Sequence, residues 1–203
     1  MKRPGSKGEH QLQKKLKTEK RASAFYKTQL LDHLNPEMCQ FIAQQEFVFI
    51  STSDSNGECD ASFRAGHPGF VQVLGKQTLI FPEYRGNGVL ASMGNISENP
   101  HIGMVFIDFY KTTIGLHVNG KAEILSNKEL EADPDFSAKF ATGQADSRKP
   151  IAWIKIIVHE AYIHCSKHIP LMQKRDKTIH WGSDDEKLKG GDFFNTKNSD
   201  SSS

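Results

Sequence analysis

The sequence predicts a mainly β fold, a closed or nearly closed antiparallel barrel with peripheral helices. Six or seven short strand-like segments follow one another between residues 47 and 164, separated by turn residues. Few helical segments lie between them, which favours an antiparallel barrel over a parallel α/β sheet. The segment 114–125 alternates with a period of two, which places one apolar set on a single face: Ile114, Leu116, Val118, Ala122 and Ile124.

Residues 1–35 are predicted to form a basic helical arm. Residues 1–27 carry a net charge of +7, so the remaining residues carry −5 of the overall +2. Apolar residues between Leu12 and Leu34 recur at irregular helical spacing and predict a helix there. Such an arm can contact nucleic acid or an acidic membrane. Because no set of stacking aromatic residues accompanies the charges, a solvated helix is favoured and we expect neither partner.

Residues 36–170 are predicted to form the barrel domain. Asn35-Pro36 predicts a helix from Pro36 to about Gln45, with Asn35 as its N-cap. The apolar run 47–50 predicts a strand buried on both faces. A helix from Asn87 to Asn99, stopped by Pro100, is also expected. Other strands are predicted at 58–64, 70–74, 78–81, 101–109 and 151–164, and a short helix around 135–142.

The cysteines, the lack of membrane and signal segments, and the polar C-terminal segment indicate the cellular compartment and the end of the folded region. The three cysteines, Cys39, Cys59 and Cys165, are odd in number and widely spaced, which argues against a disulfide framework and for a reducing compartment. The sequence shows neither a bilayer-length apolar run nor a signal peptide. We therefore expect a cytoplasmic protein. The C-terminal segment 171–203 is predicted to be disordered from about residue 195, where it is too polar to bury.

The stretch from residue 59 to 100 contains a candidate anion site. The helix predicted to begin at Gly86-Asn87-Gly88 would leave its first N–H groups unpaired and carry partial positive charge, so it would attract an anion. Glycine permits a close approach to the backbone. Arg85 adds a charge, and Arg64 on an earlier strand could reach the same region. An ordinary capped helix with two surface arginines would give the same pattern.

Two other kinds of site find little support. The set His159, His164, Cys165 and His168 has metal-binding side chains, but in a regular strand His159 and His164 face opposite sides, so we expect no metal site. No G-x-S-x-G motif marks a nucleophile.

Three motifs together resemble the FMN-binding split β-barrels of the pyridoxamine 5'-phosphate oxidase-like family. They are FVFISTSDSNGECDASFRAGHPGFV, FPEYRGNGVLASMGNISENPHIGMVFIDF and GLHVNGKAEIL, followed later by AYIHCSKH. The resemblance covers roughly residues 40–168. It implies a six-stranded, Greek-key-like antiparallel barrel and a homodimer that binds FMN in a groove between its subunits.

The resemblance also implies positions for the cofactor. The residues Ser62, Phe63, Arg64, Ala65 and Gly66 would line the flavin and its phosphate. Phe81 and Pro82 would lie against the ring or ribityl chain, and Asn87 and Gly88 would meet the phosphate beside Arg85. His117 would contribute to the floor of the groove.

The chain departs from the pyridoxamine phosphate oxidases proper at two places. They end with an Arg-x-His type of segment where this chain has His180-Trp181-Gly182 and a later GGDFF. They also tend to have an Arg-Lys pair where this chain has Gly88-Val89. These departures argue against a vitamin-B6 substrate and leave deazaflavin or haem as alternative ligands. We predict an FMN-dependent oxidoreductase of unknown small-molecule substrate. The alternative is a non-catalytic carrier or sensor of flavin, deazaflavin or haem.

Overall fold

The structure is a computed structural model that describes residues 4–132, 136, 150–180, 185–189 and 191–196. The described residues up to 173 belong to one compact unit and those from 174 onward to a second. The second contains one short 3-10 helix, η2 (Glu186–Lys189). Most of the helix predicted around 135–142, and the tail from residue 197, lie outside the described residues.

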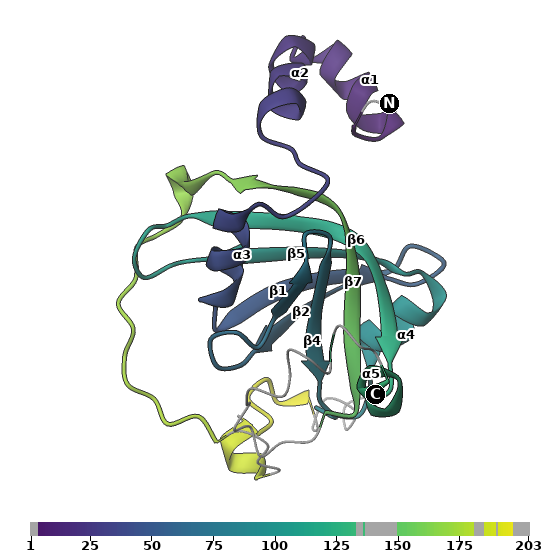
Figure 1. The fold of residues 1–203 in the computed structure, drawn as a ribbon. Coiled ribbons are helices and arrows are strands. Elements are labelled where there is room, and N and C mark those ends of the chain that lie inside the picture. The colour runs from purple at the N-terminus through teal and green to yellow at the C-terminus, as the bar shows by residue number, and fades with distance from the viewer. Residues whose placement is uncertain (1–3, 133–135, 137–149, 181–184, 190, 197–203) are drawn as a thin grey trace, which may run out of the picture. The chain divides into compact units, whose positions relative to one another are not determined.

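Seven antiparallel strands form one curved sheet in the order β2-β1-β5-β6-β7-β4-β3 (Figure 1). The predicted barrel-like β fold is confirmed, but the strands described are seven where the family arrangement predicted six. The sheet does not close, and β2 and β3 form its two edges. The strands are β1 (Phe47–Ser53), β2 (Cys59–Ala65), β3 (Gln72–Gly75), β4 (Thr78–Glu83), β5 (His101–Ile107), β6 (Gly115–Leu125) and β7 (Ala152–His164).

Short helices precede, link and follow these strands. They are α1 (Lys7–Lys15), α2 (Glu19–Thr28), α3 (Pro36–Ala43), α4 (Ala91–Glu98), α5 (Asn127–Glu131) and the 3-10 helix η1 (Ser166–His168). The single helix predicted from Leu12 is wrong, because Lys17 has φ of 57° and breaks the segment into α1 and α2. The start of α3 is confirmed, with the Asn35 side chain accepting the N–H of Met38 at 2.9 Å. Within the described residues, no helix has the length and apolar character needed to cross a bilayer.

The two faces of the sheet differ in character. On β1, Val48 and Ile50 are buried, whereas Phe49 between them is 42% exposed. The prediction that this strand is buried on both faces is therefore wrong, since the outward side chains of β1 remain accessible. The alternation predicted for β6 is largely confirmed, with Leu116 and Val118 buried and Lys121 exposed.

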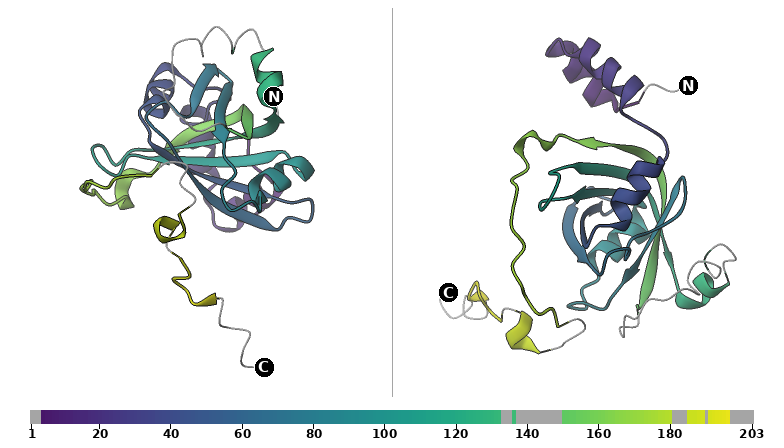
Figure 2. Two further views of the ribbon diagram at one scale, coloured as in Figure 1. Left: turned by 90° about the horizontal axis from the view of Figure 1, so that it is seen from below. Right: turned by 60° about the vertical axis from the view of Figure 1, so that its left-hand side comes forward.

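Inward side chains form the main hydrophobic core. It includes Met104 and Phe106 of β5 and receives Ile42 from α3 and Ile96 from α4. Both helices are seen beside the curved sheet in Figure 2. A smaller cluster forms around α5, where Leu130 packs with residues of β4 and β7. The core of this unit thus comes mainly from β1, β4, β5, β6 and β7 and from two flanking helices.

A β-bulge interrupts the β6–β7 ladder. Asn119 pairs with Glu160 but Gly120 pairs with Val158, so His159 has no partner in the ladder. The extra residue reverses the side-chain alternation beyond it. His159 and His164 therefore lie on the same outer face, and the prediction that they face opposite sides is wrong.

The bulge also predicts an intolerance to side chains at Gly120. A Cβ at Gly120 would overlap the carbonyl oxygen of Ile157, which belongs to the backbone of β7 and cannot rotate away. We expect Gly120→Ala to lower the free energy of unfolding by about 2 kcal/mol or more, as overpacking does. Gly75→Ala is the control, since nothing lies within 4 Å of its added Cβ. Urea denaturation measures the free energy of unfolding of both variants. Equal free energies for Gly120→Ala and Gly75→Ala would contradict this account.

Candidate cofactor site

A cavity of about 370 Å³ lies where edge strand β2 approaches the end of β4 and the start of α4. Its lining comprises residues 60 and 62–65 of β2, residue 83 at the end of β4, residues 84–87 and 89–90 of the following loop, and residues 91–93 of α4. Arg64 pairs with Val48 and Ser62 with Ile50, both buried. Paired residues of an antiparallel ladder share a face. Ser62 and Arg64 therefore face inward, toward this cavity.

Arg64 is held by a carboxylate from across the open edge of the sheet. Its Nε donates to Glu83 Oε2 at 3.0 Å, and its Nη2 lies 2.9 Å from the same oxygen in an ion pair. Its Nη1 donates to Ser62 Oγ at 2.7 Å and to the carbonyl of Phe63 at 3.2 Å. The side chains of Arg64 and Glu83 are only 19% and 9% exposed. This ion pair joins β2 to β4, between which the described sheet has no backbone ladder.

A second carboxylate lines the same cavity. Asp60 accepts a hydrogen bond from the Ser92 hydroxyl at 3.2 Å and so ties β2 to the first turn of α4. The formal charges of the lining are Arg64 and Arg85 against Asp60 and Glu83, which cancel. The cavity is therefore polar and rich in charges but neutral overall.

The helix predicted to begin at Asn87 begins four residues later, at Ala91. Gly86, Gly88 and Leu90 have φ of 55°, 81° and 59°, and such left-handed residues cannot continue a right-handed helix. The Asn87 side chain accepts the N–H of Val89 at 3.0 Å and caps no helix. The predicted start is wrong, yet Ala91, Ser92 and Met93 of the first turn of α4 still line the cavity. The N–H groups of a first helical turn lack intrahelical partners.

The structure brings together six of the predicted cofactor residues around this cavity: Ser62, Phe63, Arg64, Ala65, Arg85 and Asn87. Gly88 lies in the same loop, between lining residues. Gly66 is buried against Phe70, where a Cβ would overlap the Phe70 side chain. Phe81 is fully buried in the core, and Pro82 pairs with Trp153 in the β4–β7 ladder. Neither Phe81 nor Pro82 lines the cavity.

The sequence reasoning missed Asp60, Glu83 and Ser92. The period of two along β2 and β4 could have found the two carboxylates, because Asp60 shares a face with Ser62 and Arg64, and Glu83 shares one with Leu79 and Phe81. Ser92 carried no such signal, since its position depends on where α4 begins.

His117 lies elsewhere, on the outer face of β6. Its Nε2 is 2.7 Å from Nδ1 of His164, and its ring stacks on Tyr162 with centroids 4.6 Å apart. Phe25 of α2 contacts the same Tyr162 ring edge-on at 5.7 Å. Burial lowers the pKa of His117, and the charge that His164 would carry lowers it further. Both effects favour the neutral imidazole, and His117 does not line the Arg64 cavity.

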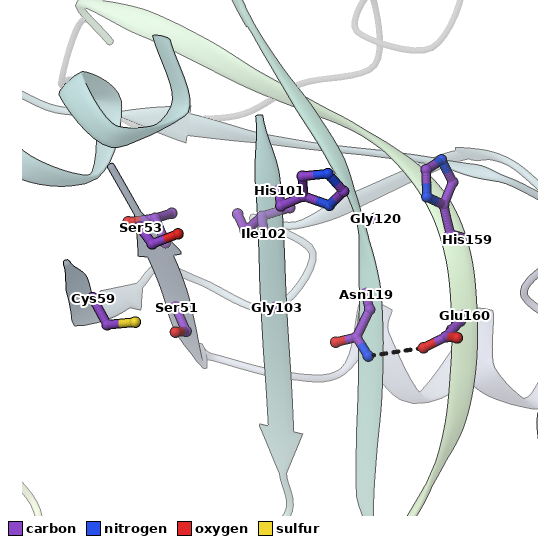
Figure 3. A pocket seen from close by; sticks show the side chains of 11 residues that line it. Ser51, Ser53, Cys59, His101, Ile102, Gly103, Asn119, Gly120, His159 and Glu160 are labelled. Atoms are coloured by element: carbon purple, nitrogen blue, oxygen red, sulfur yellow. Dashed lines mark hydrogen bonds between the residues drawn. The ribbon is translucent and has the colours of Figure 1, made fainter. Parts of the chain in front are cut away.

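A second, shallower cavity of about 450 Å³ lies on the outer face, across the strands β1, β2, β5, β6 and β7 (Figure 3). The bulge turns both His159 and Glu160 toward it, and Asn119 donates to Glu160 Oε2 at 3.3 Å. Its other polar lining residues are Ser51, Thr52, Ser53, Cys59 and His101. Despite these side-chain types, no group of three or more metal-binding side chains converges anywhere in the described residues.

Comparison with known proteins identifies the family. The family model for pyridoxamine 5'-phosphate oxidase matches residues 34–165, which span β1 to β7 and the whole Arg64 cavity. The chain belongs to the pyridoxamine 5'-phosphate oxidase family. No curated protein sequence matches the chain significantly.

Solved structures that are similar to the chain have low sequence identity to it. Group A Streptococcus HupZ is 22% identical, with 64% of this chain and 93% of that chain covered and a TM-score of 0.49. A candidate pyridoxamine 5'-phosphate oxidase from Lactobacillus delbrueckii is 19% identical, covering 66% and 99%, with a TM-score of 0.46. An FMN-binding protein from Syntrophomonas wolfei is 13% identical, covering 68% and 89%, with a TM-score of 0.44. These likenesses are too remote to assign a ligand.

The histidine pair predicts a pH-dependent stability. Because the pKa of folded His117 is lowered from its usual 6.5, the unfolded chain takes up a proton first as the pH falls below that value. Stability should therefore be full above about pH 6.5 and decrease below it. We expect the melting temperature to fall less between pH 8 and pH 5.5 in His117→Gln than in the wild type. His168→Gln, at an exposed position, is the control and should behave like the wild type. An unchanged pH profile in His117→Gln would contradict the assignment.

Proposed function

We propose that this protein binds FMN in the Arg64 cavity and acts as a flavin-dependent oxidoreductase. The observation that carries the proposal is the convergence of Arg64, Ser62, Arg85 and the first turn of α4 on one cavity of a family barrel. Guanidinium groups and unpaired backbone N–H groups are the donors that a phosphate monoester prefers. A volume of about 370 Å³ falls within the range of small-molecule sites, roughly 300–1,000 Å³.

The residues present fit such a cofactor. Arg85 and the N–H groups of the α4 start would hold the phosphate together with Arg64. The hydroxyls of Ser62 and Ser92 and the carboxylate of Asp60 suit the polyol chain of a ribityl phosphate. Phe63 borders the cavity, is 55% exposed and offers an aromatic surface to a planar ring.

When bound, FMN would supply the acceptance and donation of hydride or electrons. The protein side chains would anchor the phosphate, orient the cofactor and restrict water. No acid–base pair of this chain is required for these tasks, which agrees with the lack of a nucleophile motif. A non-catalytic carrier or sensor of flavin, deazaflavin or haem would use the same cavity. Bound FMN that neither NADH nor NADPH reduces would favour that alternative.

The absorbance spectrum and a titration test the cofactor. We expect the purified full-length chain to quench FMN fluorescence and to gain melting temperature with added FMN. Arg85→Ala should weaken FMN binding about 10-fold or more, as the loss of a charge-assisted contact worth about 1.5–3 kcal/mol predicts. The affinity of Arg85→Ala for riboflavin, which lacks the phosphate, should differ little from that of the wild type. Arg21→Ala in the arm is the matched control. A wild-type chain that binds no flavin, or a haem spectrum, would overturn the proposal.

We also propose that the protein is a homodimer in which a second copy covers the outer face of β1 and β2. Phe47, Phe49, Phe63 and Phe109 form one aromatic cluster there, with centroid separations of 5.5 to 6.1 Å. Phe49 and Phe63 are 42% and 55% exposed, and large exposed aromatic groups of this kind are typical of interfaces. Because Phe63 also borders the Arg64 cavity, a second copy seated here would close that cavity from outside.

Light scattering after size-exclusion chromatography tests the dimer. We expect a mass of two chains for the wild type and of one chain for Phe49→Asp, which places an uncompensated carboxylate in the aromatic cluster. Leu12→Asp is the matched control, since Leu12 is also exposed, at 57%, but lies on α1. It should remain dimeric. A monomeric wild type would sink this proposal and leave the cofactor proposal standing.

A further inference from the structure

We propose that Glu83 competes with a ligand phosphate for Arg64, and that this competition determines how strongly the cavity prefers a phosphorylated flavin to an unphosphorylated one. The inference rests on the proposed function, since it concerns the same cavity. Its physical basis is that the guanidinium most suited to a phosphate already has a carboxylate partner inside the site.

The contacts of Arg64 show how little of it is left for a ligand. A guanidinium has five N–H bonds. The Nε–H donates to Glu83 Oε2, and Nη2 lies 2.9 Å from the same oxygen. Both N–H groups of Nη1 are used, by Ser62 Oγ and by the carbonyl of Phe63. A phosphate that makes the two-pronged contact typical of arginine must therefore displace Glu83 from the guanidinium.

Displacement has a cost because Glu83 cannot turn to open water. Its side chain is 9% exposed, and its other oxygen, Oε1, accepts the backbone N–H of Tyr84 at 3.3 Å. A carboxylate left in such a place without its cation is strongly unfavourable. It would also lie close to the negatively charged phosphate. An uncharged ligand part would meet no such opposition, so the penalty falls on the phosphate alone.

The other carboxylate of the cavity provides an internal control. Asp60 lines the same space and carries the same charge, but its hydrogen bond goes to Ser92 rather than to Arg64. General repulsion of an anion would make both carboxylates matter. Competition for the guanidinium would make Glu83 matter much more.

The experiment compares dissociation constants of FMN and riboflavin, measured by flavin fluorescence, for the full-length wild type, Glu83→Gln and Asp60→Asn. Glutamine keeps the shape of Glu83 and an oxygen that can accept from Arg64. We expect Glu83→Gln to bind FMN about 10-fold more tightly, equivalent to about 1.4 kcal/mol, with riboflavin changed less than about threefold. Asp60→Asn should change the FMN-to-riboflavin ratio less than about threefold. Glu83→Met, similar in size and uncharged, serves as the second variant if Glu83→Gln folds poorly and should shift the ratio in the same direction.

A purely structural role for the ion pair would lower the melting temperature of Glu83→Gln without changing the ratio, and that result would overturn the inference. Weaker FMN binding by Glu83→Gln would also overturn it, since Glu83 would then position Arg64 for the phosphate. If Asp60→Asn shifted the FMN-to-riboflavin ratio as much as Glu83→Gln does, general repulsion of the phosphate by carboxylates would explain the result instead.

Failure of the proposed function would be visible separately, as a wild type that binds neither flavin. Inorganic phosphate is then the probe, at constant ionic strength. Under the inference, phosphate raises the melting temperature of Glu83→Gln more than that of the wild type. An equal rise of the melting temperature in Glu83→Gln and the wild type would contradict a competition between Glu83 and phosphate for Arg64.

Discussion

The ion pair between Arg64 and Glu83 is the contact on which the candidate site depends. The sheet curls without closing, and no backbone ladder joins β2 to β4 among the described strands. Two charges that are almost withdrawn from water each cost several kcal/mol, and each is tolerated because the other neutralises it. The pair therefore holds the open edge together and fixes the guanidinium within the cavity. The same contact that shapes the site also limits the charge that it can offer to an anion.

Much of the fold could be predicted from the sequence because its signals are local. The N-cap of α3 depends on Asn35 and Pro36 alone, and the alternation of β6 is read within one strand. The start of α4 could not be predicted in this way. Gly86 and Gly88 resemble a helix start, but Leu90, a residue that rarely adopts positive φ, also does so and delays the helix to Ala91.

The lining of the candidate site was predicted in part, and the carboxylates of Asp60 and Glu83 were missed. The resemblance indicated Ser62 and Arg64, and the structure places both on the inner face of β2. Glu83 ends a strand, where a carboxylate is usually solvated. Only the curvature of the sheet, which brings the end of β4 to the opposite edge, shows that its partner is Arg64. The prediction that His159 and His164 face opposite sides failed for a comparable reason. A bulge depends on how two strands pair, so it cannot be recognised from the sequence of one strand.

The pleat of β2 links ligand binding to assembly in this chain. Ser62 and Arg64 face inward to the cavity, and Phe63 between them faces outward to the aromatic cluster. Consecutive residues of one strand thus serve the two proposals. A register slip of one residue would turn the guanidinium of Arg64 to the aromatic face and remove it from the cavity. The seven residue pairs between β1 and β2, with Val48 and Ile50 buried, hold that register. The hydrophobic core is therefore what keeps the charged and aromatic faces of β2 apart.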